Sequence, residues 1–128
     1  MKLPIALAVG TAMLASVAAQ AADDPSIWGE KRADVQSAML RHINDRHLDG
    51  KYVMFDGMDA SLMQLTFDDL HKGIVRKGEF FVSCADFRDA YGEIYDLDFL
   101  VADTDEGYRV MQTVVHKVGN EKRKYTVE

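Results

Sequence analysis

Apolar residues between positions 27 and 47 recur at the spacing of an α-helix. This i, i+3, i+4, i+7, i+8 spacing places a largely apolar stripe on one face of a helix. The stripe is formed by Val35, Ala38, Met39, His42 and Ile43. Asp24-Pro25-Ser26 is typical of a helix start, because Asp or Ser accepts free backbone amides and Pro is tolerated in the first turn. Gly50 is typical of a helix end. The pattern therefore predicts one amphipathic helix over about 27–47.

After Gly50 the pattern changes to short segments typical of strands, separated by Gly-containing turns. Lys72-Gly73 and Lys77-Gly78 predict turns on either side of a short segment, and the polar run 103–107 predicts another turn. That run lacks the spacing of a calcium-binding loop. The expected strands cover 51–56, 61–72, 79–88, 93–102, 108–118 and 123–127, with the short segment 74–76 between the first two turns. We expect a meander of about five or six strands.

The segment 79–102 permits a register prediction. If residues 90–92 form a three-residue loop, residues whose numbers add up to 182 face each other across the hairpin. One face then carries the apolar pairs Phe87–Tyr95, Ala85–Leu97, Ser83–Phe99 and Phe81–Val101. The other face carries Arg88–Ile94, Asp86–Asp96, Cys84–Asp98 and Val82–Leu100. We expect the apolar face to pack against the helix.

One helix followed by a meander indicates an α+β domain in which a curled antiparallel sheet buries one face against an N-terminal amphipathic helix. This order of elements resembles the cystatin-like and PepSY-like groups of small exported domains. The resemblance covers the chain after residue 21 at the level of element order, and it implies a shape without implying a function.

The second hairpin face gathers Asp86, Asp96 and Asp98 beside Cys84. Like charges that face each other on a sheet are destabilising, so something must offset them. Continuing the meander across 103–107 places Gln112 near Asp98 and His116 near Ile94. These six residues, Cys84, Asp86, Asp96, Asp98, Gln112 and His116, are the candidate ligand or cation site.

Three interpretations of this cluster are open. It is a solvated sheet face, a site for a hard cation such as Ca²⁺ bound through oxygen, or a carboxyl pair that shares a proton and acts as an acid or base. His71 and His116 lie on different expected strands, so a zinc site would need a strand order that brings them together.

Residues 1–21 have the composition of a secretory signal peptide. Lys2 precedes a run without charged side chains, and Ala19 and Ala21 place small residues at the −3 and −1 positions. The run is short and rich in Ala for a spanning helix, which needs about 20 strongly apolar residues. We expect cleavage after Ala21, a single exported α+β domain at 22–128, a periplasmic or secreted location, and no permanent membrane anchor.

Charge and cysteine content restrict the partners. Loss of Lys2 leaves 14 basic and 21 acidic residues, a net charge of −7. A negative domain repels phosphate backbones, so we expect no nucleic acid but a protein, a small ligand or a cation. Cys84 is the only cysteine, which rules out an internal disulfide. It is a buried apolar residue, a reactive thiol or a link between two chains of a homodimer.

Two functions fit these observations. The first is a small exported binding or accessory protein, because the sequence contains no nucleophile–base pattern, phosphate loop or haem motif. The alternative is a small enzyme or cation-binding domain that uses the carboxylate cluster. No cofactor is expected apart from a divalent cation.

Overall fold

The computed structural model describes residues 22–124. The expected signal peptide, residues 1–21, lies outside these residues, as does the end of the strand expected at 123–127. Among the described residues, no helix is both long and apolar enough to cross a membrane.

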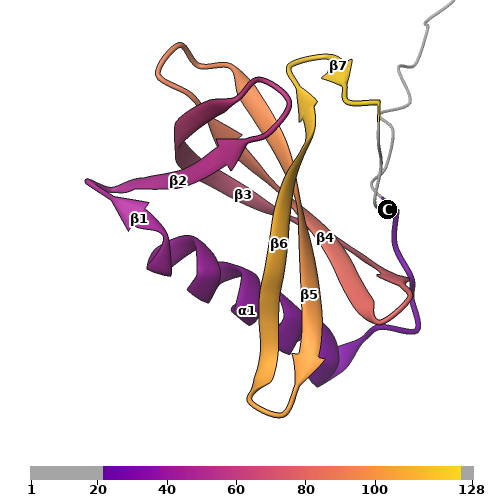
Figure 1. Ribbon diagram of the computed structural model, residues 1–128. Helices are drawn as coiled ribbons and strands as arrows, with labels where there is room; N and C mark the ends of the chain where they lie inside the picture. Colours follow the sequence, from indigo (N-terminus) through magenta and orange to yellow (C-terminus); the bar gives the residue numbers. More distant parts are fainter. Residues whose placement is uncertain (1–21, 125–128) are drawn as a thin grey trace, which may run out of the picture.

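The described chain is an α+β unit in which one helix packs on an open antiparallel sheet (Figure 1). The helix α1 covers Gly29–Asp45. Seven strands follow, each hydrogen-bonded to the next in chain order. Their bounds are β1 His47–Leu48, β2 Lys51–Asp56, β3 Ser61–Lys77, β4 Phe80–Arg88, β5 Ile94–Thr104, β6 Gly107–Val118 and β7 Glu121–Lys122. The α+β class is confirmed.

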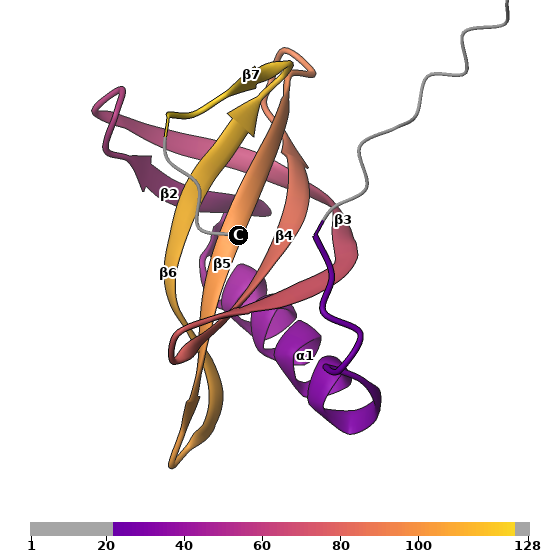
Figure 2. The same cartoon turned by 90° about the vertical axis from the view of Figure 1, so that its right-hand side faces the viewer.

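The sheet curls around the helix, so that α1 lies along its concave side (Figure 2). The apolar stripe of α1 is buried at Val35, Ala38, Met39 and Ile43. From the sheet, the core receives aromatic and aliphatic side chains on alternate positions, among them Tyr52, Leu65, Ile74, Phe81, Phe87, Leu97, Phe99, Val101 and Val115. One continuous core therefore joins the helix to β2–β6.

The predicted register of the β4–β5 hairpin is confirmed at every position from Phe80↔Ala102 to Arg88↔Ile94. Asp89 fixes the turn, because its backbone N–H donates to the Glu93 carbonyl at 3.1 Å and its Oδ1 accepts the Tyr91 and Glu93 amides. Gly92 has a φ of 81°, which favours glycine. A short loop of this kind fixes the register of the two strands.

The helix is shorter at both ends than predicted. Asp24 Oδ1 accepts the Ser26 amide within a turn that precedes the helix, so neither residue caps it. Gly50 does not end the helix. Asp49 and Gly50, with φ of 53° and 77°, form the two-residue turn between β1 and β2. Positive φ at both positions is the requirement of a type I′ hairpin turn, for which Asp-Gly is a preferred sequence.

The predicted turn at Lys72-Gly73 is wrong, because β3 continues to Lys77. Leu70 faces Ala85 and Ile74 faces Ser83, so residues 71–73 occupy the space opposite Cys84 alone. Ser83 Oγ donates to the Gly73 carbonyl at 2.7 Å and ties this irregularity to β4. Glycine inside a strand marks a bulge rather than a turn here. The segment expected at 74–76 therefore belongs to β3. In the described part of the chain, the two-residue strands β1 and β7 bring the number of strands to seven, against the expected five or six.

The helix holds the same irregularity through Arg32. Its guanidinium donates to the Lys72 carbonyl and pairs with Asp23 Oδ1 at 2.7 Å. Asp23 Oδ1 also accepts the Ile74 amide at 3.1 Å, and the Asp24 amide donates to the Ile74 carbonyl at 2.8 Å. The segment before the helix is thereby attached to the part of β3 that carries His71.

Candidate metal centre

The face of the β4–β5 hairpin that points away from α1 carries a compact group of side chains with metal-ligating atoms. They form two sets that share Asp96, and within each set the ligand atoms lie within 4.8 Å of one another. The inner set is Cys84, Asp96, Asp98 and His116, and the outer set is His71, Asp86 and Asp96. We use these two names below.

The inner set is buried. Cys84 on β4 and Asp98 on β5 are directly paired across the hairpin, with 2% and 1% of their surfaces exposed. Cys84 Sγ donates to Asp98 Oδ1 at 2.8 Å, and His116 Nδ1 lies 3.1 Å from the same oxygen. Thiol, carboxylate and imidazole therefore converge from β4, β5 and β6.

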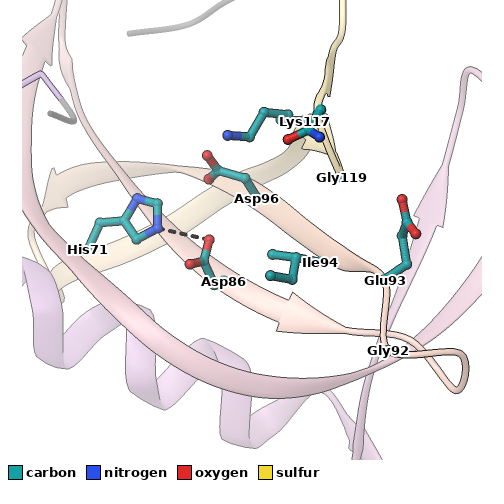
Figure 3. Close-up of a pocket in the computed structure, with 9 residues that line it drawn as sticks. His71, Asp86, Gly92, Glu93, Ile94, Asp96, Lys117 and Gly119 are labelled. Atoms are coloured by element: carbon teal, nitrogen blue, oxygen red, sulfur yellow. Dashed lines mark hydrogen bonds and ion pairs between the residues drawn. The ribbon is translucent and has the colours of Figure 1, made fainter. Parts of the chain in front are cut away.

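The outer set lies closer to solvent. His71 Nε2 is 2.9 Å from Asp86 Oδ1, and both side chains are partly exposed (Figure 3). His71 belongs to the β3 irregularity opposite Cys84, and Asp86 faces Asp96 across the β4–β5 hairpin. The three side chains thus come from three neighbouring strands.

Asp96 is the side chain that joins the two sets. Only 9% of its surface is exposed, and among the described residues its Oδ1 has no hydrogen-bond partner. Burial raises the pKa of Asp96 above its usual value, nearby His71 and His116 lower it, and Asp98 and Asp86 raise it again. A buried carboxylate oxygen without a partner is costly in an apolar environment, so this position favours a bound cation or a proton.

A pocket of about 460 Å³ opens beside the outer set. His71, Asp86 and Asp96 point into it, with Lys117 beside Asp96 (Figure 3). The remaining wall consists of Gly92, Glu93, Ile94, Gly119 and Asn120. Gly119 has a φ of 56°, and a Cβ there would overlap the Glu93 carboxylate. The outer set is therefore reachable from solvent, whereas Cys84, Asp98 and His116 of the inner set do not line the pocket.

The predicted site is only partly what the structure assembles. Cys84, Asp86, Asp96 and Asp98 lie together as the hairpin register required. The expected pairing of Gln112 with Asp98 is wrong by two residues, because Gln112 faces Leu100 and is exposed, outside the cluster.

His116 does belong to the cluster, although not opposite Ile94 as predicted. The β5–β6 register shifts between Asp96↔Lys117 and Leu97↔Val115, which leaves His116 as the extra residue of an irregularity. The interpretation of this face as a solvated surface is wrong for Cys84, Asp96 and Asp98, which are all buried.

His71 is the site residue that the candidate set omitted. The meander order β3-β4-β5-β6 places His71 and His116 on the strands that flank the hairpin, so both reach its outer face. The sequence signal was available, since a Gly inside an otherwise strand-like segment suggests a bulge and His71 lies two residues before Gly73.

The donor atoms of the cluster are two imidazoles, one thiol and three carboxylates. Ca²⁺ and Mg²⁺ prefer oxygen ligands alone, whereas Zn²⁺ and related transition-metal ions bind Cys, His and carboxylate together.

No protein-family model, curated protein or solved structure matches the chain.

Proposed function

We propose that the protein is a small exported binding protein whose ligand is a divalent transition-metal ion of the Zn²⁺ class, bound in the cluster that the inner and outer sets form around Asp96. The single observation that carries the proposal is the buried Asp96 Oδ1, which has no hydrogen-bond partner among the described residues and lies where two sets of ligand atoms meet. A cation at this position would supply the missing partner and offset the repulsion among the carboxylates.

The compartment is part of the same proposal. Cleavage after Ala21 would release a domain that starts at Ala22, one residue before the Asp23 that supports β3. The net charge of −7 expected after cleavage favours cations and disfavours nucleic acid. One helix at the start of the exported domain, followed by a curled meander, supports a cystatin-like or PepSY-like shape.

A partner protein in the periplasm or extracellular space fits an accessory role, in which the bound ion is delivered or received. A homodimer linked through Cys84 is less well supported, because only 2% of Cys84 is exposed and its thiol donates to Asp98.

The second candidate function is acid–base catalysis by Asp96. The raised pKa of Asp96, caused first by burial, and its position on the wall of a pocket favour it. This candidate needs a carboxyl group that exchanges protons with a pocket-bound substrate, whereas metal binding needs the same group to stay ionised with histidine and thiolate beside it.

Thermal unfolding with added metal tests the proposal. Protein purified after expression of the full chain is treated with EDTA, then heated with Zn²⁺, Co²⁺, Ca²⁺ or Mg²⁺. An ion at about 100 times its dissociation constant stabilises the folded state by about 2.7 kcal/mol, roughly 10 °C or more in a domain of this size. We expect this shift with Zn²⁺ and Co²⁺ and little change with Ca²⁺ or Mg²⁺.

Asp96→Asn should reduce the shift by at least about half, which is the effect of a 10-fold higher dissociation constant. Asp103→Asn is the matched control, because Asp103 is exposed on the same strand and lies outside the cluster. An unchanged melting temperature of the original protein with Zn²⁺ and Co²⁺, or an equal shift in Asp96→Asn, would contradict metal binding at this site.

A further inference from the structure

We infer that Asp96 bridges two metal ions, one in a closed position formed by the inner set and one in an open position formed by the outer set. This inference rests on the proposed function and specifies the architecture of that site. It rests on the geometry of the two sets, their combined charge and the position of the pocket.

Each set is compact enough to surround one ion. Zn²⁺ lies about 2.0–2.3 Å from its ligand atoms, so two ligands of one ion are at most about 4.6 Å apart. The ligand atoms of each set lie within 4.8 Å of one another, so minor side-chain adjustment brings them within this limit. Only Asp96 belongs to both sets. One ion therefore takes one set or the other as its complete ligand shell.

Asp96 has the geometry of a bridge. A carboxylate offers two oxygens, and paired ions in two-metal sites lie about 3.5–4 Å apart. The Asp96 carboxylate shares one set with Cys84, Asp98 and His116 and the other set with His71 and Asp86. Its buried Oδ1 makes no other hydrogen bond to the described residues, so ligation there breaks none.

The charge of the cluster matches two divalent ions. Asp86, Asp96 and Asp98 are anionic when they ligate, and Cys84 ligates as a thiolate. These four groups carry four negative charges, which two divalent ions neutralise. One ion would leave two negative charges in a largely buried region, and Lys117 beside the pocket offsets one of them at most.

The two positions differ in chemistry. The inner set supplies four protein ligands, including the thiolate, and is buried, as in closed structural zinc sites. The outer set supplies three ligands and faces the pocket, so its ion keeps a position for water or another exchangeable ligand. Both histidines that complete the sets lie at irregularities of strand register, in β3 and between β5 and β6.

Cobalt titration separates the two positions. Protein from the full chain is stripped of metal and titrated with Co²⁺, while native mass spectrometry counts bound ions and absorbance records the thiolate-to-cobalt charge-transfer band. We expect two ions per chain and a charge-transfer band that saturates with one of them. Cys84→Ser should retain one ion without the band, and His71→Gln should retain one ion with the band.

Asp96→Asn should weaken both ions at least 10-fold, since a bridging ligand serves both positions. His47→Gln, an exposed histidine on β1, and Asp103→Asn should bind two ions like the original protein. Circular dichroism verifies folding of each variant, and Asp86→Asn and Cys84→Ala replace any variant that does not fold.

The outcomes separate this inference from the proposed function. One ion per chain, lost in both Cys84→Ser and His71→Gln, would show a single site and overturn the two-ion inference while the proposed function stands. No bound ion in the original protein would overturn both. Two ions that persist unchanged in Asp96→Asn would place the metal elsewhere and contradict both.

Discussion

The two faces of the β4–β5 hairpin are both buried near their centres, yet they are built from opposite chemistry. Toward α1, the rings of Phe87 and Phe99 are stacked within the apolar core, with 6.2 Å between the ring centroids. Away from α1, Cys84, Asp96 and Asp98 are equally inaccessible but polar. The first face stabilises the fold through apolar area removed from water. The second face destabilises the fold unless its buried carboxylates are paired with a proton or a cation.

The largest expected effect tests the apolar face. Phe99→Ala removes a fully buried ring that packs on Phe87, Tyr52 and His42. Such truncations cost about 3–5 kcal/mol, because transfer energy is lost and a cavity remains. Urea unfolding of the metal-free protein measures the free energy of unfolding. A loss below about 1 kcal/mol would show that this face does not hold the fold.

A smaller effect of opposite sign tests the polar face. Asp96→Asn removes a buried charge near two other carboxylates and leaves a neutral amide of the same shape. An unsatisfied buried polar group costs about 1–3 kcal/mol when it is neutral and more when it is charged, so the substitution should lower this cost. We expect the metal-free variant to melt at least about 4 °C higher than the original protein at neutral pH. Differential scanning calorimetry measures this shift, with Asp103→Asn as control. A lower melting temperature for Asp96→Asn would mean that its carboxylate stabilises the metal-free fold.

The smallest effect concerns pH and His42, which lies on α1 and packs against Phe99 of the apolar face. Burial lowers the pKa of His42 below its usual value of 6.5, Arg46 lowers it further and Asp45 raises it. Its Nε2 lies 3.0 Å from the Tyr52 hydroxyl, the other titratable group that faces it. Below pH 6.5 the unfolded chain takes up the proton first, so stability falls as pH decreases and levels off below the lowered pKa.

His42→Gln should therefore flatten the loss of stability between neutral and mildly acidic pH, while His47→Gln leaves it unchanged. Urea unfolding at a series of pH values gives both slopes. The difference between the variants separates the half-buried His42 from the exposed His47. Equal slopes in the original protein and His42→Gln would contradict a neutral, buried His42.

The sequence predicts those features of the two hairpin faces that depend on residues close together in the chain. Periodicity identifies the buried stripe of α1, and the Asp89–Glu93 turn determines which residues of the hairpin share a face. Gln112 and His71 show where such local information fails. Each extra residue in a strand reverses the direction of later side chains, and a bulge is stabilised by tertiary contacts, such as Arg32 to the Lys72 carbonyl.

The attachment of Asp23 to β3 has a consequence for the maturation of the protein. The cleavage after Ala21 that we propose would leave Asp23 in place, with its carboxylate between Arg32 and the Ile74 amide. A protease that trimmed the new N-terminus past Asp23 would remove this brace from the stretch of β3 that presents His71. The position of the cleavage would then determine how firmly His71 is held. Two forms of the domain that differ by a few residues would therefore release the proposed ion at different rates.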